Sequence, residues 1–444
     1  MPRTDPPFVR VVVINFDGGA VTLRCLDALL ASDYPRDRLE IVLVDNASVD
    51  GLNWVLKAQY PGVVLIESDI NEGFARGCNL GIGDLTGVDM VALVNNDAIV
   101  QPDWLWRLQN GFSDERVGAV VPKLLLNVHA RTVFFHTERL DTDDEGRSVG
   151  VQVESAVLNG DVQGKGDGPE VYHDERFWPD DGWTKAPLAA MWWESTPEAP
   201  ADHLELRLSS RSPMSIRVGE PGRELALAVG PEPVTVELSL TDHRRIINSA
   251  GGAMYAGWFG GDRGFLEPDV GQYEEPEEVF SWCGGAVLLR TQYLREVGLF
   301  DPTYFLYYED FDLSWRGRSV GWTYRFEPSA VVFHEHAYSS KAGSPFFEYW
   351  VDRNRRLTLV KNAPAGVALR AVGGSAARLG RVLARHTLNQ ARRLRPPSPW
   401  VVRELLVGYW RFARALPRAV RERRRIARTS TVSRAAIAAW TVHK

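Results

Sequence analysis

The feature that most constrains the fold is a repeated alternation of strand-like and helix-like segments over residues 9–126. The first strand is "VRVVVIN" (9–15), a continuous run of β-branched residues that is typical of a parallel strand buried on both faces. A helical segment, "TLRCLDALLAS", follows it. The strand pattern then returns three times, in "LEIVLVD" (39–45), "VVLIESD" (63–69) and "MVALVNND" (90–97). This alternation predicts βαβ units and a doubly wound parallel sheet.

Polar residues stand at the end of each of these strands. They are Asn15, Asp45, Asp69 and the run Asn95-Asn96-Asp97. In open α/β sheets the ligand lies off the carboxyl ends of the strands, so these positions predict a binding crevice. Local turns that use Asn and Asp for hydrogen bonding are the structural alternative.

The pattern changes over residues 127–243, where short alternating strands such as "HLELRLS" and "VTVELSL" replace the helices. Turns every eight to twelve residues indicate an all-β, sandwich-like module inserted into the α/β domain. We therefore expect a first α/β part over 1–126, the insertion over 127–243 and a second α/β part over 244–345. Trp192 and Trp193 in the insertion favour core packing, with a glycan-binding patch as the alternative.

The last segment, 346–444, reads as a basic helical region. It holds 22 Lys and Arg against 4 Asp and Glu, a net charge of +18, while residues 1–345 hold 29 against 53, a net charge of −24. Interleaved Leu, Tyr, Trp and Phe suit a helix on an anionic membrane surface. A solvated helical bundle fits equally well, whereas nucleic acid is disfavoured because no recognition motif accompanies the charge.

The beginning of the chain and its three cysteines bear on the compartment. No secretory signal pattern is visible at the N-terminus, and no apolar run reaches the roughly 18 residues that span a bilayer. Cys25, Cys78 and Cys283 are odd in number and far apart, which favours reduced thiols. We expect a cytoplasmic protein, with a peripheral position at the inner membrane face left open, and a homo-oligomer also left open.

Several short motifs carry candidate chemistry. In "LVNNDA" (93–98) an acid at a strand end suits a hard divalent cation. Asp45 is placed to accept a hydrogen bond from a uracil or thymine base, and His334 in "HEH" (334–336) is a candidate metal ligand. The segment "FLYYEDFDLSWR" (305–316) sets Glu309 and Asp310 side by side behind a run of aromatic residues.

The order of these motifs resembles that of family 2 glycosyltransferases with a GT-A fold, particularly the bacterial rhamnosyl- and galactofuranosyltransferase-like members. The resemblance rests on "NEGFARGCNLGI" (71–82), "NND" (95–97), "CGGAVLLR" (283–290), "YYEDFDLSWR" (307–316) and "HEHAYSS" (334–340). It covers roughly 9–126 and 244–362, including the pair Arg353-Asn354. The β insertion and the last 80 or so residues lie outside it.

The resemblance implies a role for each matching residue. Asp310 would be the catalytic base with Glu309 beside it, and Asp97 and His334 would bind Mg²⁺ or Mn²⁺, Asn95 replacing the first acid of the usual metal motif. The nucleotide-sugar side would comprise Asn15, Asp45, Asn71, Gly73, Phe74, Asn79, Asn95 and Asn96. The acceptor side would comprise Trp282, Gly284 and Gly285.

The chemistry of sugar transfer agrees with this assignment. A cation stabilises the leaving diphosphate and one base takes the proton of the acceptor hydroxyl. A glycoside hydrolase needs two carboxyl groups flanking the bond, whereas neighbours on a helix point about 100° apart. Asp312 fits an i,i+4 ion pair with Arg316 on the helix surface.

We therefore expect an inverting glycosyltransferase that moves a sugar, rhamnose or galactofuranose by resemblance, from a UDP or dTDP donor. The acceptor would be a glycan or a lipid-linked glycan of cell-wall or polysaccharide biosynthesis. The alternative is a catalytically weak scaffold that binds glycans through the β module and the basic tail. A sugar-nucleotide pyrophosphorylase is disfavoured because no Gly- and Arg-rich loop follows the first strand.

Overall fold

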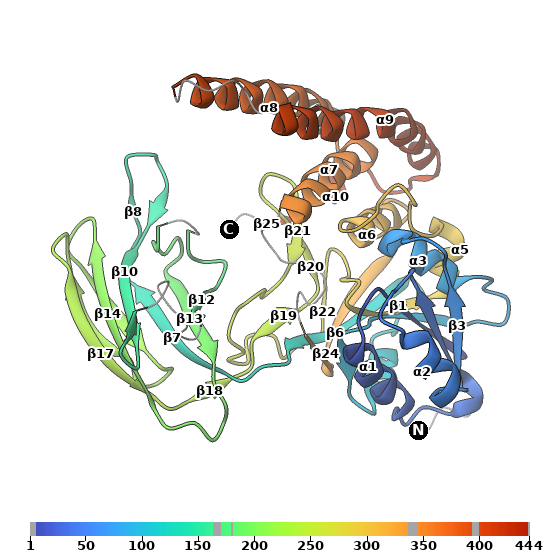
Figure 1. Cartoon of the computed structure of the whole chain (residues 1–444), viewed down its shortest axis with the longest axis horizontal. Coiled ribbons are helices and arrows are strands. Elements are labelled where there is room, and N and C mark those ends of the chain that lie inside the picture. The colour runs from blue at the N-terminus through green and yellow to red at the C-terminus, as the bar shows by residue number, and fades with distance from the viewer. Residues whose placement is uncertain (1–5, 163–169, 179–180, 336–344, 393–398, 443–444) are drawn as a thin grey trace. The chain divides into compact units, whose positions relative to one another are not determined.

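The computed structural model describes residues 6–162, 170–178, 181–335, 345–392 and 399–442 (Figure 1). Two compact units make up the chain. Unit 1 comprises 1–123, 251–263 and 275–444, and unit 2 comprises 124–250 and 264–274. The parts of the "HEHAYSS" and "RPPSP" motifs at 336–340 and 395–398 lie outside the described residues.

Unit 1 is built on a ten-stranded sheet whose first strands are parallel. Their spatial order is β4-β1-β2-β3, and Asn15 stands opposite Asp45 in the β1–β2 register. The strands are β1 (Val9–Asn15), β2 (Leu39–Asp45), β3 (Val63–Glu67) and β4 (Met90–Asn95). The intervening helices are α1 (Ala20–Leu30), α2 (Leu52–Gln59) and α3 (Gly73–Ile82), with a short 3₁₀ turn at Arg36–Arg38. The βαβ prediction for residues 9–97 is confirmed.

Beyond β4 the sheet becomes antiparallel, so the predicted parallel pairing holds for β1 to β4 and the sheet as a whole is mixed. β23 (Ala286–Arg290) runs antiparallel to both β4 and β6 (Val117–Leu126). β24 (Thr323–His334) runs antiparallel to β5 (Ala98–Val100) and β22 (Glu277–Glu278). Strands that follow one another in the chain need a crossover connection to run parallel. β23 reaches β4 from a distant part of the chain, so no such connection fixes its direction. Helices α4 (Trp104–Asn110), α5 (Thr291–Val297) and α6 (Glu309–Ser319) complete this part.

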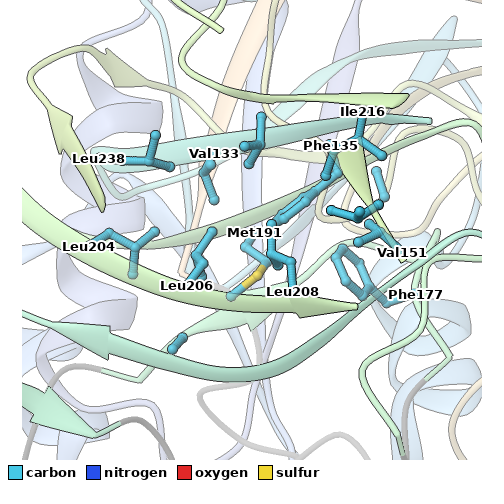
Figure 2. Close-up of a cluster of buried hydrophobic side chains, with 14 of the residues drawn as sticks. Val133, Phe135, Val151, Phe177, Met191, Leu204, Leu206, Leu208, Ile216 and Leu238 are labelled. Atoms are coloured by element: carbon cyan, nitrogen blue, oxygen red, sulfur yellow. The ribbon is translucent and has the colours of Figure 1, made fainter. Parts of the chain in front are cut away.

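Unit 2 consists mainly of two antiparallel sheets, in the orders β11-β10-β14-β17 and β12-β13-β7-β15-β16. Alternating apolar side chains from both sheets point toward one another and form its core (Figure 2). The longer strands are β7 (Ala130–Thr137), β10 (Val151–Leu158), β13 (Leu188–Glu194), β14 (Asp202–Ser210), β15 (Met214–Gly219), β16 (Leu225–Val229) and β17 (Val234–Leu240). The shorter ones are β8 (Asp141–Thr142), β9 (Ser148–Val149), β11 (Asp161–Val162), β12 (Tyr172–His173), β18 (His243–Arg244) and β19 (Ile247–Ser249).

The two tryptophans of the β module are buried. Trp193 is 1% exposed within this core, and its indole N–H donates to Asp202 Oδ2 at 2.8 Å. Trp192 is 2% exposed and stacks on the ring of Tyr172, with the centroids 4.3 Å apart. The core-packing prediction for both residues is confirmed, since neither indole is open to a sugar ring.

The C-terminal region is helical and packs within unit 1, where α7 contacts both α8 and α9 (Figure 1). The helices are α7 (Pro345–Asn362), α8 (Ala365–Arg392), α9 (Pro399–Thr429) and α10 (Arg434–Ala438). These elements, the α/β sheet and the β module confirm the predicted GT-A-like α/β fold class.

The end of the chain is part of the core of unit 1. The short strand β25 (Thr441–Val442) pairs with β20 (Gly252–Tyr255), which also pairs with β21 (Phe259–Asp262). Ile437 is 2% exposed in the apolar cluster that also contains Phe311 and Trp315 of α6. Deleting residues 396–444 would therefore remove core packing as well as basic charge. Within the described residues, no helix has the length and hydropathy to span a bilayer.

Candidate active site

Three polar side chains meet at the carboxyl ends of β1, β2 and β4. Asn15, fully buried, donates from Nδ2 to Asp45 Oδ1 at 3.1 Å, and its Oδ1 accepts from Asn96 Nδ2 at 3.2 Å. Asp45 is 2% exposed and its second oxygen accepts from Asn53 Nδ2 at 2.9 Å. Thr22 Oγ1 also donates to Asn15 Oδ1 at 2.7 Å. Parallel strands bring these residues to one edge of the sheet, as the sequence predicts.

A second cluster forms where β4 ends and β24 ends. His334 Nε2 lies 2.9 Å from Asp97 Oδ1 and 3.2 Å from Asn95 Nδ2. These residues are 237 or more positions apart in sequence and meet because β24 pairs with β5, which places His334 opposite Ala98. The backbone reinforces the contact, since Glu335 N donates to Asp97 O at 2.9 Å.

This second cluster suits a hard divalent cation. Asp97 supplies a carboxylate, His334 an imidazole nitrogen and Asn95 an amide whose oxygen is a ligand type that Mg²⁺ and Mn²⁺ accept. One imidazole nitrogen faces both a carboxylate oxygen and an amide N–H, so a single tautomer cannot satisfy both neighbours. Among the described residues, no group of three or more His, Cys, Asp or Glu side chains could hold a metal.

The beginning of α3 is shaped by a close backbone approach. Gly73 has φ of +75°, and a Cβ there would lie 2.3 Å from the carbonyl oxygen of Phe305. Phe74 N donates to that same carbonyl at 2.7 Å, and Asn71 Oδ1 accepts from Gly73 N at 2.9 Å. Only glycine fits both the backbone conformation and the space. The α3 loop is thereby held against the segment that precedes α6.

Asn79, one turn further along α3, binds the backbone of Phe300 through both ends of its amide. Nδ2 donates to Phe300 O at 2.9 Å, and Oδ1 accepts from Phe300 N at 3.1 Å. Trp282 is 1% exposed, and its ring packs edge-on against that of Phe300. Both residues thus contact Phe300, and their assignments to the nucleotide-sugar side and the acceptor side stay predictions.

Gly284 and Gly285 connect the second cluster, which contains Asn95, to the candidate base Asp310. Gly285 O accepts from Asn95 N at 2.9 Å, and Gly284 N donates to Asp310 Oδ2 at 3.0 Å. A Cβ on Gly284 would lie 3.2 Å from the ring of Phe74 and 3.7 Å from Asp310 Oδ2. Two consecutive residues of one loop therefore anchor the end of β4 and the Asp310 carboxylate.

Tyr307 and Tyr308 have a left-handed backbone conformation and set the direction in which α6 begins. Tyr307 and Tyr308 have φ of 68° and 70°, an arrangement that non-glycine residues adopt only when their surroundings impose it. Asn354 of α7 supplies part of that constraint, because Nδ2 donates to Leu306 O and Tyr307 O, both at 2.8 Å. Asn354, the second residue of the Arg353-Asn354 pair, thus stabilises the turn that presents Glu309 and Asp310.

The two acids differ in their hydrogen bonding. Asp310 Oδ2 accepts from Gly284 N, and its Oδ1 accepts from Phe311 N at 2.6 Å. Burial raises the pKa of Asp310, and these two hydrogen bonds oppose that rise. Glu309 is 5% exposed, and its Oε2 has no hydrogen-bond partner among the described residues. Burial first, and then the neighbouring Asp310 charge, raise the pKa of Glu309 well above its usual value. Of the two carboxyl groups, Glu309 is therefore the one that holds its proton more tightly.

Replacing Glu309 by Gln is expected to raise the melting temperature at pH 8. The raised pKa of Glu309 means that the folded state holds its proton more tightly than the unfolded chain. Wild-type stability must then fall as pH rises above the ordinary Glu pKa of about 4.3. Glutamine never ionises, so the gain should disappear below about pH 4. Thermal melts of both proteins between pH 4 and 8 measure this, and a lower melting temperature of E309Q at pH 8 would contradict it.

Asp312 forms the predicted ion pair with Arg316, but the pair is buried and does not lie on the helix surface. Asp312 is fully buried, and Arg316 Nε lies 3.0 Å from its Oδ2. Lys361 Nζ lies 2.7 Å from Asp312 and 2.8 Å from Asp301, and Asn362 Nδ2 donates to Asp312 Oδ1 at 2.9 Å. The surface prediction failed because α7 covers this side of α6, which helical spacing alone does not reveal.

Burial alone would raise the pKa of Asp301, yet the Lys361 ammonium and its hydrogen bond lower that pKa well below the usual range. Sequence reasoning missed Lys361 and Asn362 in this network, although both belong to the "YWVDRNRRLTLVKN" segment that carried the resemblance. A Lys-Asn pair ending a helix is ordinary surface composition, so only the packing identifies their role.

Comparisons with known proteins bear on the first part of the site. The Glycosyl transferase family 2 model matches residues 10–154. The chain is 27% identical over 104 residues to the glycosyltransferase AglE of Haloferax volcanii, covering 23% of this chain and 34% of that protein. It is 41% identical over 68 residues to N-acetylglucosaminyl-diphospho-decaprenol L-rhamnosyltransferase of Mycobacterium tuberculosis, covering 15% of this chain and 22% of that protein. The chain thus matches about a third or less of the length of these relatives.

A crystal structure of GalNAc-T7 with UDP, GalNAc and Mn²⁺ aligns with 81% of this chain and 48% of that chain, at a TM-score of 0.45 and 15% identity. The family match contains the polar strand ends, the α3 loop and Asp97, and it ends before Glu309, Asp310 and His334. Residues 10–154 are thus similar to the Glycosyl transferase family 2 model.

Proposed function

We propose that this protein is an inverting glycosyltransferase with Asp310 as its general base. One observation supports this most strongly. The loop Gly284-Gly285 binds the Asp310 carboxylate through one residue and the end of β4 through the next. A proton acceptor and a cluster suited to a cation are thereby tied to the same short loop, beside the residues of a family 2 domain.

The proposed reaction is a single displacement. The acceptor hydroxyl oxygen attacks the anomeric carbon of the donor sugar, and the bond from that carbon to the diphosphate oxygen breaks. The nucleoside diphosphate leaves with the bonding pair, and the hydroxyl proton passes to Asp310. One base on the acceptor side suffices, which fits a site where Glu309 remains protonated. A neutral Glu309 donates a hydrogen bond to the acceptor, while Asp310 accepts the proton of the acceptor hydroxyl.

The donor side of the proposal uses the polar strand ends. Asp45 and Asn15 are assigned to the nucleobase of a UDP or dTDP sugar, and Asn71, Gly73 and Phe74 to the sugar diphosphate. Asp97, His334 and Asn95 are the residues that would hold Mg²⁺ or Mn²⁺. When bound there, the cation would neutralise charge that develops on the leaving diphosphate. The similarity to a rhamnosyltransferase acting on a decaprenol-linked sugar favours a rhamnose donor and a lipid-linked glycan acceptor.

The rival proposal, a catalytically weak scaffold that binds glycans through the β module and the basic tail, gains no support from the tryptophans of that module. The two tryptophans suited to stacking on sugars are 2% and 1% exposed in that module.

A thermal-shift panel tests the donor assignment. UDP, dTDP and GDP sugars are each added to the full chain with Mn²⁺, Mg²⁺ or EDTA. A uridine or thymidine donor with a divalent cation is expected to raise the melting temperature, because a ligand at 100 times its Kd stabilises the folded state by about 2.7 kcal/mol. The EDTA arm should show a smaller shift. The hit is then incubated with lipid-linked glycan acceptors, and release of free nucleoside diphosphate is measured.

Replacing Asp97 by Asn is expected to abolish the metal-dependent part of that shift, because the cluster then lacks its carboxylate. Asp33→Asn serves as the matched control, since Asp33 is an exposed acid between α1 and β2. Equal donor shifts in both variants would overturn the metal assignment. A donor shift without any nucleotide release would leave a binding protein in place of the enzyme.

A further inference from the structure

Helix α9 presents a line of exposed side chains along one face. Side chains three or four positions apart lie on the same side of a helix. The members of this line are Leu406, Trp410, Arg414, Arg421, Arg424 and Arg428, and every one of them is exposed. The opposite side of α9 is the packed one, where Phe412, Ala419 and Ile426 are 5%, 4% and 5% exposed. We call the six exposed residues the α9 outer face.

This face is divided along its length. Its N-terminal end is apolar, with Leu406 48% and Trp410 56% exposed. Its C-terminal end carries Arg421, Arg424 and Arg428, none of which has an acidic partner within the described part of the chain. Arg414 joins the two ends, because its guanidinium carbon lies 5.1 Å from the centroid of the Trp410 ring. A large apolar surface and unpaired cations thus lie side by side.

The surrounding charge is also one-sided. Helix α9 contains nine Arg and two Glu, and α8 contains five Arg and no Asp or Glu. One of the α9 acids, Glu422, is already paired with Arg425 at 2.8 Å. The concentration of positive charge favours an anionic partner.

The combination of residues distinguishes between anionic partners. A nucleic acid or another soluble polyanion would engage the arginines but gains little from Leu406. A phospholipid surface satisfies both ends, because anionic headgroups attract the arginines while Trp and Leu enter the boundary with the acyl chains. A helix with arginines and exposed apolar side chains along one face suits a position in the plane of the interface.

We propose that the α9 outer face binds an anionic phospholipid surface with the helix lying in the plane of the membrane interface. Binding requires neither a sugar donor nor a metal. Its outcome is therefore separate from that of the transferase proposal.

Vesicle co-sedimentation of the full chain tests this surface. Phosphatidylcholine vesicles are compared with vesicles containing 30% phosphatidylglycerol, at low and high salt. The protein is expected to sediment with the anionic vesicles, and less so at high salt because screening weakens the attraction. The double change Arg421→Glu and Arg424→Glu should weaken that binding by about tenfold or more, since each arginine near the surface contributes severalfold. Its matched control is Arg217→Glu with Arg223→Glu, two exposed arginines of unit 2, which should bind as the wild type does.

The apolar end has its own variant. Trp410→Ala is expected to weaken binding to the anionic vesicles severalfold while leaving the melting temperature within a degree or two, because the ring is more than half exposed. Trp54→Ala, which removes an 81% exposed ring from α2, is the control and should change nothing. Unchanged vesicle binding by the arginine double variant would overturn the proposal. It would also be overturned if Trp410→Ala bound normally while a single-stranded RNA competed fully, since the face would then be a general polyanion site.

Discussion

Replacing Asp310 by Asn is expected to lower kcat by about 10²- to 10⁴-fold while leaving donor binding intact. The Asp310 carboxylate accepts hydrogen bonds from Gly284 N and Phe311 N, so it is held in one orientation. Asparagine has the same shape, but its single oxygen can accept only one of those two bonds, and it cannot take a proton. The measurement is initial-rate kinetics together with the donor-induced shift in melting temperature.

The pH dependence gives this prediction a second readout. Burial raises the pKa of Asp310, so kcat/KM of the wild type should rise with pH through a midpoint above the ordinary Asp value of about 3.9. The residual rate of D310N should lack that rising limb. Glu309→Gln is the adjacent comparison and should lose less turnover than D310N, because the glutamine amide can still donate a hydrogen bond to the acceptor. Full turnover by D310N would show that another group is the base.

Replacing Lys361 by Met is expected to destabilise unit 1 by about 3–5 kcal/mol, the usual cost of breaking a buried ion pair by removing one partner. Lys361 Nζ lies 2.8 Å from Asp301 and 2.7 Å from Asp312, and its side chain is 2% exposed. Arg418 at 3.3 Å from Asp301 and Arg316 at 3.0 Å from Asp312 offset part of the loss. We therefore expect the lower end of the range, measured as a fall in the denaturation midpoint of the transition that reports α6 and α7.

The sign of the pH dependence follows from Asp301. Its pKa is lowered in the folded state, so the stabilisation is present above the unfolded Asp pKa of about 3.9 and is lost as pH falls further. The difference between wild type and K361M should accordingly shrink below pH 4. Lys57→Met is the matched control, because its pair with Glu67 is 56% and 47% exposed and should cost about 1 kcal/mol or less. Equal losses for the two variants would contradict a buried network.

The α/β part of the fold is readable from the sequence because buried parallel strands leave a strong local signal. Runs such as "VRVVVIN" must be apolar on both faces, so strand type and position follow from composition alone. The β module is readable for the related reason that half-buried strands alternate. The direction of β23 could not be predicted from the sequence, because antiparallel pairing with β4 depends on how a distant segment enters the sheet.

The candidate site likewise contains residues that could be grouped from the sequence and residues that could not. Asn15, Asp45 and Asn96 could be grouped in advance because one topological rule brings strand ends together. The meeting of His334 with Asp97, and of Gly284 with Asp310, depends on pairings between elements more than 20 residues apart. Motif order suggested those meetings through a resemblance, but no spacing in this chain implies them.

The sequence by itself determined the elements of the α/β and β parts, the polar strand ends and the basic character of the C-terminal region, since each is a local or compositional property. Only the tertiary structure decided which acids are buried and which groups surround each of them. Asp310 receives backbone hydrogen bonds, one Glu309 oxygen has no hydrogen-bond partner in the part of the chain that the structure describes, and Asp312 lies beneath α7. The physical reason is that pKa and ion-pair strength depend on burial and on neighbours in space, and helix α7 supplies those neighbours from about 50 residues further along the chain.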